Sequence, residues 1–183
     1  FAITLTSRAL VEERKKGTLE RLLTTRLSVG ELFGGKFLAN VARGFVQTFI
    51  LLALAYIVFQ IFTPLSFLEV LVIALVFSAA VSTVGLIIGS VARTEDQAIW
   101  IAVFFTMLMV MVGGTFFEIS EGSVLYAISK ASLNTYANDA FKTIIAQGGS
   151  LADVALEMGV LAGVTVIGLI LSRVLFRVMS EGR

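Results

Sequence analysis

The positions of charged residues divide the chain into long apolar stretches. Three intervals, 44–68, 70–92 and 97–117, contain 25, 23 and 21 residues and no Asp, Glu, Lys or Arg. A helix needs about 20 apolar residues to cross a hydrocarbon core of roughly 30 Å, because each residue adds about 1.5 Å. A fourth stretch is less clean, with one acidic residue near its start and one basic residue near its end. The pattern predicts four membrane-spanning helices, over about 41–62, 68–92, 97–117 and 154–176.

Pairs of polar residues three positions apart precede the apolar stretches. In a capping box, the first side chain accepts a hydrogen bond from the first helical turn, and the second side chain binds back to the backbone. Each pair therefore predicts the start of a helix. The pairs are Ser28 with Glu31, Thr94 with Gln97, and Ser150 with Asp153.

The connection 118–150, between the third and fourth predicted spans, contains a shorter helical pattern over 135–147. This piece is too short and too polar to cross a membrane, so we expect a re-entrant or surface helix. Gly148 and Gly149 follow it and are suited to end it. Its apolar residues at helical spacing are Ala137, Ala140, Phe141, Ile144 and Ile145.

The segment 8–40 is charged and polar. Within it, Leu19, Leu22 and Leu23 form a stripe on one face of a predicted helix, opposite Glu20 and Arg21. One interpretation is a juxtamembrane helix whose basic residues bind anionic lipid headgroups. The other is a docking helix that presents leucines to a cytoplasmic partner. The residues alone leave both interpretations open.

Lysine and arginine predict the orientation, because cytoplasmic loops of membrane proteins carry an excess of them. With 8–43 in the cytoplasm, 12 of the 14 basic residues lie inside and only Lys130 and Lys142 lie outside. The chain is then a multi-pass protein of the inner (cytoplasmic) membrane, and its C-terminus is cytoplasmic. The short connection 118–150 is extracellular.

Composition narrows the possible chemistry. Hydrophobic residues make up 57% of the chain and charged residues 15%, which indicates that the lipid bilayer is the main solvent. Cysteine and histidine are both absent, which removes thiolate and imidazole metal ligands and the common catalytic triads. We find no catalytic constellation and no metal site. A net charge of +1 does not suggest a nucleic-acid-binding protein.

The segment Gly30 to Phe37 resembles a phosphate-binding P-loop, but Phe37 replaces the hydroxyl residue that would bind magnesium. No buried strand precedes it, and a helix starting near Ser28 would use its amides in helical hydrogen bonds. We therefore expect this chain to bind no cofactor, and the energy source must be another polypeptide.

Gly85 and Gly89 are four residues apart on a predicted span. Such a pair lets another helix approach closely, either within the chain or across a dimer.

Three motifs, in this order, resemble those of ABC-2 type transporter permeases. The first is Glu-x-x-x-Gly-Thr-Leu-Glu-x-Leu-Leu-x-Thr at 13–25, followed by Gly35-Lys36. The second is Gly-Leu-Ile-Ile-Gly-Ser-Val-Ala-Arg-Thr-Glu-Asp-Gln-Ala at 85–98. The third is Gly-Gly-Thr-Phe-Phe at 113–117, which looks like the family's glycine break, at Gly113 and Gly114, in the outer part of a span. Arg26, Glu118 and Leu133 depart from the family pattern, because many relatives carry proline there.

The resemblance implies a single transmembrane domain over 1–183. It belongs to a six-span layout in which 1–7 is the tail of the second span, so the chain is expected to be truncated at its N-terminal side. The fold expected is an all-α bundle of transmembrane helices with a cytoplasmic coupling helix at 18–25. The coupling residues implied are Gly17, Thr18, Leu19, Glu20, Arg21, Leu22 and Leu23.

The function implied is that of an exporter permease that forms the substrate pathway with a second permease subunit, in a homodimer or a heterodimer. A separate ABC ATPase subunit would bind ATP and magnesium and dock on the coupling helix. Two alternatives stay open: a secondary transporter driven by an ion gradient, and a membrane scaffold or sensor that transports nothing. The substrate and the residues that bind it are unknown from the sequence.

Overall fold

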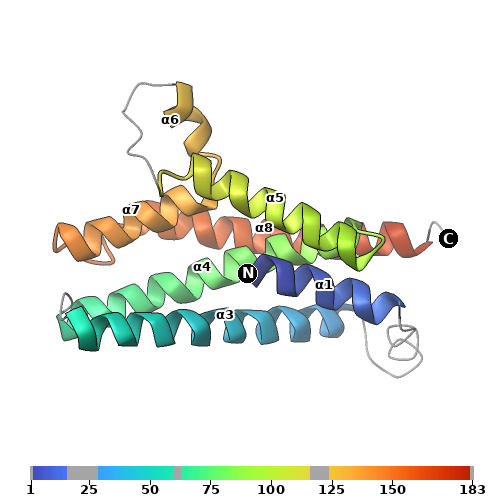
Figure 1. Cartoon of the computed structure of the whole chain (residues 1–183), viewed down its shortest axis with the longest axis horizontal. Coiled ribbons are helices and arrows are strands. Elements are labelled where there is room, and N and C mark those ends of the chain that lie inside the picture. The colour runs from blue at the N-terminus through green and yellow to red at the C-terminus, as the bar shows by residue number, and fades with distance from the viewer. Residues whose placement is uncertain (1, 16–28, 60–62, 116–123, 182–183) are drawn as a thin grey trace.

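A computed structural model describes residues 2–15, 29–59, 63–115 and 124–181, and all regular structure within these ranges is helical. Four of the helices are long and apolar enough to cross a membrane: 33–59, 64–91, 95–112 and 155–175. The prediction of an all-α protein with four spans is therefore confirmed. The helices, shown in Figure 1, are α1 (Ala2–Lys15), α3 (Val29–Phe59), α4 (Pro64–Val91), α5 (Glu95–Val112), α6 (Val124–Ser129), α7 (Leu133–Ala146) and α8 (Ala155–Glu181).

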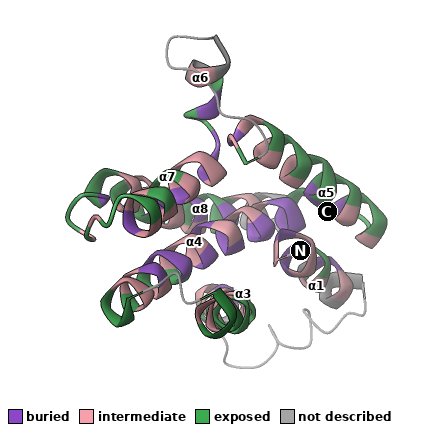
Figure 2. Cartoon of the chain, turned by 60° about the vertical axis from the view of Figure 1, so that its left-hand side comes forward, coloured by how far each residue is buried: buried purple, intermediate pink, exposed green. Residues whose placement is uncertain are grey.

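Helix α4 lies at the centre of the bundle. It packs against α1, α3, α5, α7 and α8, and Figure 2 shows buried residues concentrated along it. Its sequence is apolar around its whole circumference, which is typical of a helix surrounded by other helices. The outer helix α3, in contrast, exposes most of its side chains.

Glycines let two helices approach α4 closely. A Cβ atom at Gly85 would lie 2.6 Å from Cβ of Thr6, so α1 and α4 meet there backbone to backbone. A Cβ atom at Gly168 of α8 would lie 2.5 Å from Oγ1 and 2.7 Å from Cβ of Thr83 on α4. Gly85 thus makes a close contact within the chain, and Gly89 is also buried. The sequence pattern did not indicate Gly168.

Capping interactions hold the helix starts that the polar pairs predict. Thr94 accepts a hydrogen bond from the backbone N–H of Gln97 (3.2 Å), and the Gln97 amide oxygen accepts one from the Arg93 N–H (2.9 Å). The Asp153 carboxylate accepts hydrogen bonds from the backbone N–H and the hydroxyl of Ser150. These two bonds lower the pKa of Asp153. Ser28 lies outside the described residues.

Helix ends differ from the predicted span limits in two places. Helix α3 begins at Val29, where the Ser28 and Glu31 pair predicts a helix start, and so before the span predicted from residue 41, because a helix continues into the aqueous phase whereas hydropathy reports only its lipid-embedded part. Helix α5 ends at Val112 rather than at residue 117. Gly114 adopts a φ of 67° there, a left-handed conformation that ends helices and that glycine adopts readily.

Helix α7 forms where the amphipathic pattern predicts it. Its buried residues include Ala137, Ala140 and Ile144, and the last two pack with Val70, Ile73 and Val154 in one cluster. Helix α7 runs alongside α4 and α8 (Figure 1). Its apolar face therefore packs on protein, and its place as a re-entrant or a surface helix stays a prediction.

Gly148 follows α7 with a φ of 66°. The backbone N–H of Gly149 donates to the Thr143 carbonyl at 3.0 Å. This bond and the left-handed Gly148 close the end of the helix.

Candidate functional site

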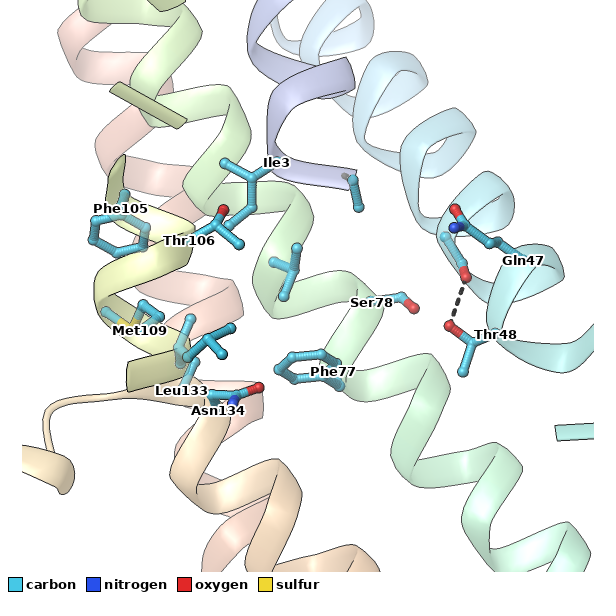
Figure 3. Close-up of a pocket in the computed structure, with 14 residues that line it drawn as sticks. Ile3, Gln47, Thr48, Phe77, Ser78, Phe105, Thr106, Met109, Leu133 and Asn134 are labelled. Atoms are coloured by element: carbon cyan, nitrogen blue, oxygen red, sulfur yellow. Dashed lines mark hydrogen bonds between the residues drawn. The ribbon is translucent and has the colours of Figure 1, made fainter. Parts of the chain in front are cut away.

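A cavity of about 280 Å³ lies between α1, α3, α4, α5 and the start of α7. Ser78, near the middle of α4, is on its wall, so the cavity lies at about half the depth of that span (Figure 3). The first residues of α1 border it on one side. A largely apolar, concave space between membrane helices is the usual form of a small-molecule site.

Most of the cavity wall is apolar. Phe77 of α4, Phe105 and Met109 of α5, and Leu133 of α7 contribute side chains to it (Figure 3). These four residues come from three helices, and they lie together only because those helices pack against one another. A ligand that fits among them would bury apolar surface, at about 25 cal/mol for each Å² removed from water.

The polar side chains on the wall fall into two groups. Thr48 donates to the Gly44 carbonyl (2.9 Å) and Thr106 to the Ala102 carbonyl (2.7 Å), so both hydroxyls are already used within their helices. The Ser78 hydroxyl and the Gln47 amide have no hydrogen-bond partner among the described residues. They are the groups available to orient a ligand.

A second cavity, polar and of about 240 Å³, lies beside α7. Asp139 and Lys142 are on its wall. Burial raises the pKa of Asp139, Lys142 opposes this shift, and the Glu157 carboxylate adds to it. Oε2 of Glu157 is itself buried with no hydrogen-bond partner among the described residues. Among the described residues, no three His, Cys, Asp or Glu side chains form a group that could hold a metal ion.

The predicted coupling residues, 17–23, lie outside the described residues. In the chain they connect α1 to α3, and both of these helices contribute to the wall of the main cavity. Gly113 and Gly114 directly follow α5, and the Gly113 carbonyl accepts a hydrogen bond from the Asn138 amide (3.0 Å). Their role as the family's outer glycine break stays a prediction.

The P-loop-like segment 30–37 lies within α3. Its backbone amides are therefore part of a continuous helix and do not form a loop around a phosphate. The helix predicted through this segment is present, and the absence of nucleotide binding stays a prediction.

Sequence reasoning did not identify Gln47 or Ser78 as site residues. Both are uncharged polar residues inside charge-free intervals, and polar side chains within membrane spans are functional candidates by default. That signal was present, but it does not show which of the polar residues share a cavity.

Comparison with known proteins shows one matching family and one similar curated protein. The family model for the ABC-2 type transporter matches residues 1–146. Over 155 residues the chain is 29% identical to the linearmycin resistance permease protein LnrN of Bacillus subtilis (strain 168), and this match covers 83% of the chain. The chain spans 40% of the length of that curated relative.

Proposed function

The chain belongs to the ABC-2 type transporter family, and on this basis we propose that it is the membrane-spanning permease subunit of an ATP-driven exporter. It forms the substrate pathway and couples to a separate ATPase subunit. The observation that carries the proposal is the family match over 1–146, which includes the segment 8–40 and three of the four apolar spans. The partners are the ATPase, a second permease subunit whose sequence is identical or related to this one, and the surrounding lipid.

The geometry supplies a route for coupling. The segment 17–23 lies between α1 and α3 in the chain, and residues of both helices line the cavity. Helix α3 has 31 residues and is therefore about 46 Å long. A movement of the coupling segment, imposed by the ATPase, would act on both of these helices.

Helix α1 is tied to two other helices. Its Arg8 forms an ion pair with Glu95 at the start of α5 (3.3 Å), and its Thr6 contacts Gly85 of α4. The ion pair is partly exposed and contributes only about 0 to 1 kcal/mol. The close glycine contact is the stronger constraint, so α1 and α4 would move together. Cavity opening would then occur mainly between this pair and α3 or α5.

ATP and magnesium belong to the partner ATPase in this proposal, and the permease breaks no bond. A secondary transporter is less well supported, because buried charged relays along the spans would be expected. The intervals 44–68, 70–92 and 97–117 contain no Asp, Glu, Lys or Arg, and a single acidic residue, Glu69, separates the first two intervals. Its carboxylate accepts a hydrogen bond from the Leu151 backbone at 3.3 Å.

Inside-out membrane vesicles that contain the permease and its ATPase test the proposal. The name of the relative makes linearmycin the first compound to examine. We expect uptake that requires hydrolysable ATP and persists when a protonophore collapses the proton gradient. Uptake driven by an imposed ion gradient without ATP would instead support a secondary transporter. ATPase binding without any ATP-dependent uptake would support a scaffold.

The orientation of the spans is a separate prediction, motivated by the asymmetry of 12 basic residues against two. The chain has no cysteine, so Leu65→Cys and Asp96→Cys introduce single thiols. Both positions are exposed; Leu65 lies in the first turn of α4, and Asp96 lies beyond the other end of α4, in the first turn of α5. We expect a membrane-impermeant maleimide to label Leu65→Cys in intact cells and to label Asp96→Cys only after the cells are opened. The reverse pattern would overturn the orientation, and neither substitution alters the number of basic residues.

A further inference from the structure

Helices α7 and α8 form an antiparallel pair (Figure 1), and two apolar clusters fix how their residues face each other. Leu133 of α7 shares one cluster with Leu161 of α8. Ile144 of α7 shares the other with Val154, which directly precedes α8. All four side chains are buried. The register of the two helices is therefore fixed near both ends of their contact.

One acidic residue of each helix lies between these clusters. Asp139 stands between the two clustered residues of α7, and Glu157 stands between Val154 and Leu161. In an antiparallel pair with this register, residues 139 and 157 come opposite each other. Val154 and Leu161, three positions before and four after Glu157, lie on the same helix face. That face packs on protein, which explains why Oε2 of Glu157 is buried with no partner among the described residues.

The two carboxylates affect each other unfavourably. Burial raises the pKa of Asp139, Lys142 on the same helix opposes this rise, and the Glu157 carboxylate adds to it. No described residue forms a hydrogen bond or an ion pair with Asp139. Like charges at close range disfavour the ionised form of both groups. The clusters on either side prevent the helices from separating at this point without a loss of apolar contacts.

The other ionisable groups described around this contact have partners of their own or lie far from it. In the described part of α5, the acidic residues are in the first turn, at the opposite end from α7. The groups with partners are Glu69 of α4, which accepts from the Leu151 N–H, Asp153, which accepts from Ser150, Lys130, which lies over the Tyr126 ring, and Tyr136, which donates to the Lys130 carbonyl.

We infer that Asp139 and Glu157 form a proton-sensitive contact between α7 and α8, which one proton, taken up from the predicted outer side, tightens by removing the repulsion between two carboxylates. Asp139 is exposed, so water reaches it directly. The effect extends to α5, because Asn138, the neighbour of Asp139, donates to the Gly113 carbonyl at the end of α5 (3.0 Å). The inference concerns the folded chain and does not rest on the function proposed above.

The direction of the pH dependence follows from linkage. In the folded chain the pKa of Asp139 lies above the ordinary value of 3.8, so the folded state binds this proton more readily than the unfolded state. Ionised Asp139 therefore destabilises the fold at any pH above its folded pKa. This loss decreases as the pH falls through the folded pKa and vanishes below the unfolded one.

Asp139→Asn removes the charge and keeps the shape of the side chain. In the purified, detergent-solubilised permease at about pH 8, where carboxylates are ionised, we expect it to raise the apparent melting temperature. The gain should become smaller at each step as the pH is lowered to about 4, near the ordinary pKa of Asp. A gain of equal size throughout, or a lower melting temperature at about pH 8, would overturn the inference.

Asp153→Asn is the matched control, because Asp153 is an acidic residue at the same end of the bundle in the opposite situation. Hydrogen bonds from Ser150 hold the pKa of Asp153 below the ordinary value, so it stays ionised over most of this pH range. Asp153→Asn should lower the melting temperature, and by a similar amount at about pH 8 and about pH 5. The two substitutions thus differ in both the sign and the pH dependence of their effects.

Glu157→Gln tests whether the two carboxylates act as a pair. Either substitution alone removes the repulsion, so the double variant with Asp139→Asn should gain less than the two separate gains combined. Additive gains would show that the two residues do not interact, and the paired contact would be ruled out.

The packing of α7 is measured separately with a thiol at a buried position. The chain has no cysteine, and Ile144 is 1% exposed in the cluster with Val154, so Ile144→Cys reacts with N-ethylmaleimide only when α7 opens locally. At about pH 8, adding Asp139→Asn should slow this labelling. The comparison is made at a single pH, so the reactivity of the thiol itself is the same in both proteins. Equal labelling rates would show that the charge does not act on the contact between α7 and α8, and the inference fails.

Discussion

Replacing Leu22 and Leu23 together by alanine should release the ATPase subunit and abolish ATP-driven transport, while the permease still inserts with unchanged topology. If each leucine buries fully against the partner, its loss costs about 1.5 to 3 kcal/mol. Since about 1.4 kcal/mol is a factor of ten, the double substitution should weaken docking by roughly two to four powers of ten. Retention of the ATPase on affinity-purified permease measures the effect directly.

Two comparisons make this result specific. Glu20→Ala and Arg21→Ala, on the opposite face of the predicted helix, should each change retention little, because exposed ion pairs contribute about 0 to 1 kcal/mol. Neutralising Arg14, Lys15 and Lys16 should be the more damaging change only if the segment is a lipid-binding helix. Full retention of the ATPase in the double-leucine variant would contradict the coupling assignment.

The spans were predictable because the bilayer imposes one simple requirement on every helix. Lipid cannot hydrate a charge, so the intervals 44–68, 70–92 and 97–117 had to be free of charged residues wherever a helix crosses. The same requirement says nothing about where a helix ends in water. Helix α3 begins at Val29, 12 residues before the predicted span, and it was the polar pair Ser28 and Glu31, not hydropathy, that predicted this start.

The cavity was not predictable in the same way. Gln47, Ser78 and Thr106 lie on three different helices, and their sequence positions do not show which faces of those helices meet. That information depends on how closely the helices approach, which is set by small residues on α4 and its neighbours. Gly85 was recognised because Gly89 follows it at the spacing of a known motif. Gly168 has no glycine four residues away but is followed by Ser172 at that spacing, a weaker form of the same motif, so its contact with Thr83 was identified only in the structure.

The position of α7 illustrates the same limit. Its amphipathic pattern predicted a helix with one apolar face, but a membrane surface and a protein surface satisfy such a face equally well. The structure shows that Ala140 and Ile144 pack against residues of α4 and of the segment that precedes α8. Periodicity thus identifies the buried face and leaves its partner open.

Gly168→Ala should destabilise the bundle, whereas Gly163→Ala on the same helix should not. A Cβ atom at Gly168 would lie 2.7 Å from Cβ of Thr83, whereas a Cβ atom at Gly163 has no heavy atom within 4 Å. Because the Thr83 Cβ is fixed to its backbone, rotation of the side chain does not remove the contact, and α8 must move away from α4. Overpacking of this kind costs about 1 to 3 kcal/mol. At Gly163 the same substitution lacks this cost and adds helix propensity worth up to about 1 kcal/mol.

The measurement is the apparent melting temperature of each detergent-solubilised variant, followed by fluorescence-detected size-exclusion chromatography after heating. Gly168→Ala should melt below the unsubstituted protein, and Gly163→Ala should melt at or slightly above it. Thr83→Gly removes the atoms that a Cβ at Gly168 would meet, so adding it to Gly168→Ala should cost less than the two separate losses combined, as expected for residues in contact. Equal melting temperatures for the two alanine variants would show that α4 and α8 do not meet at Gly168 in the folded protein.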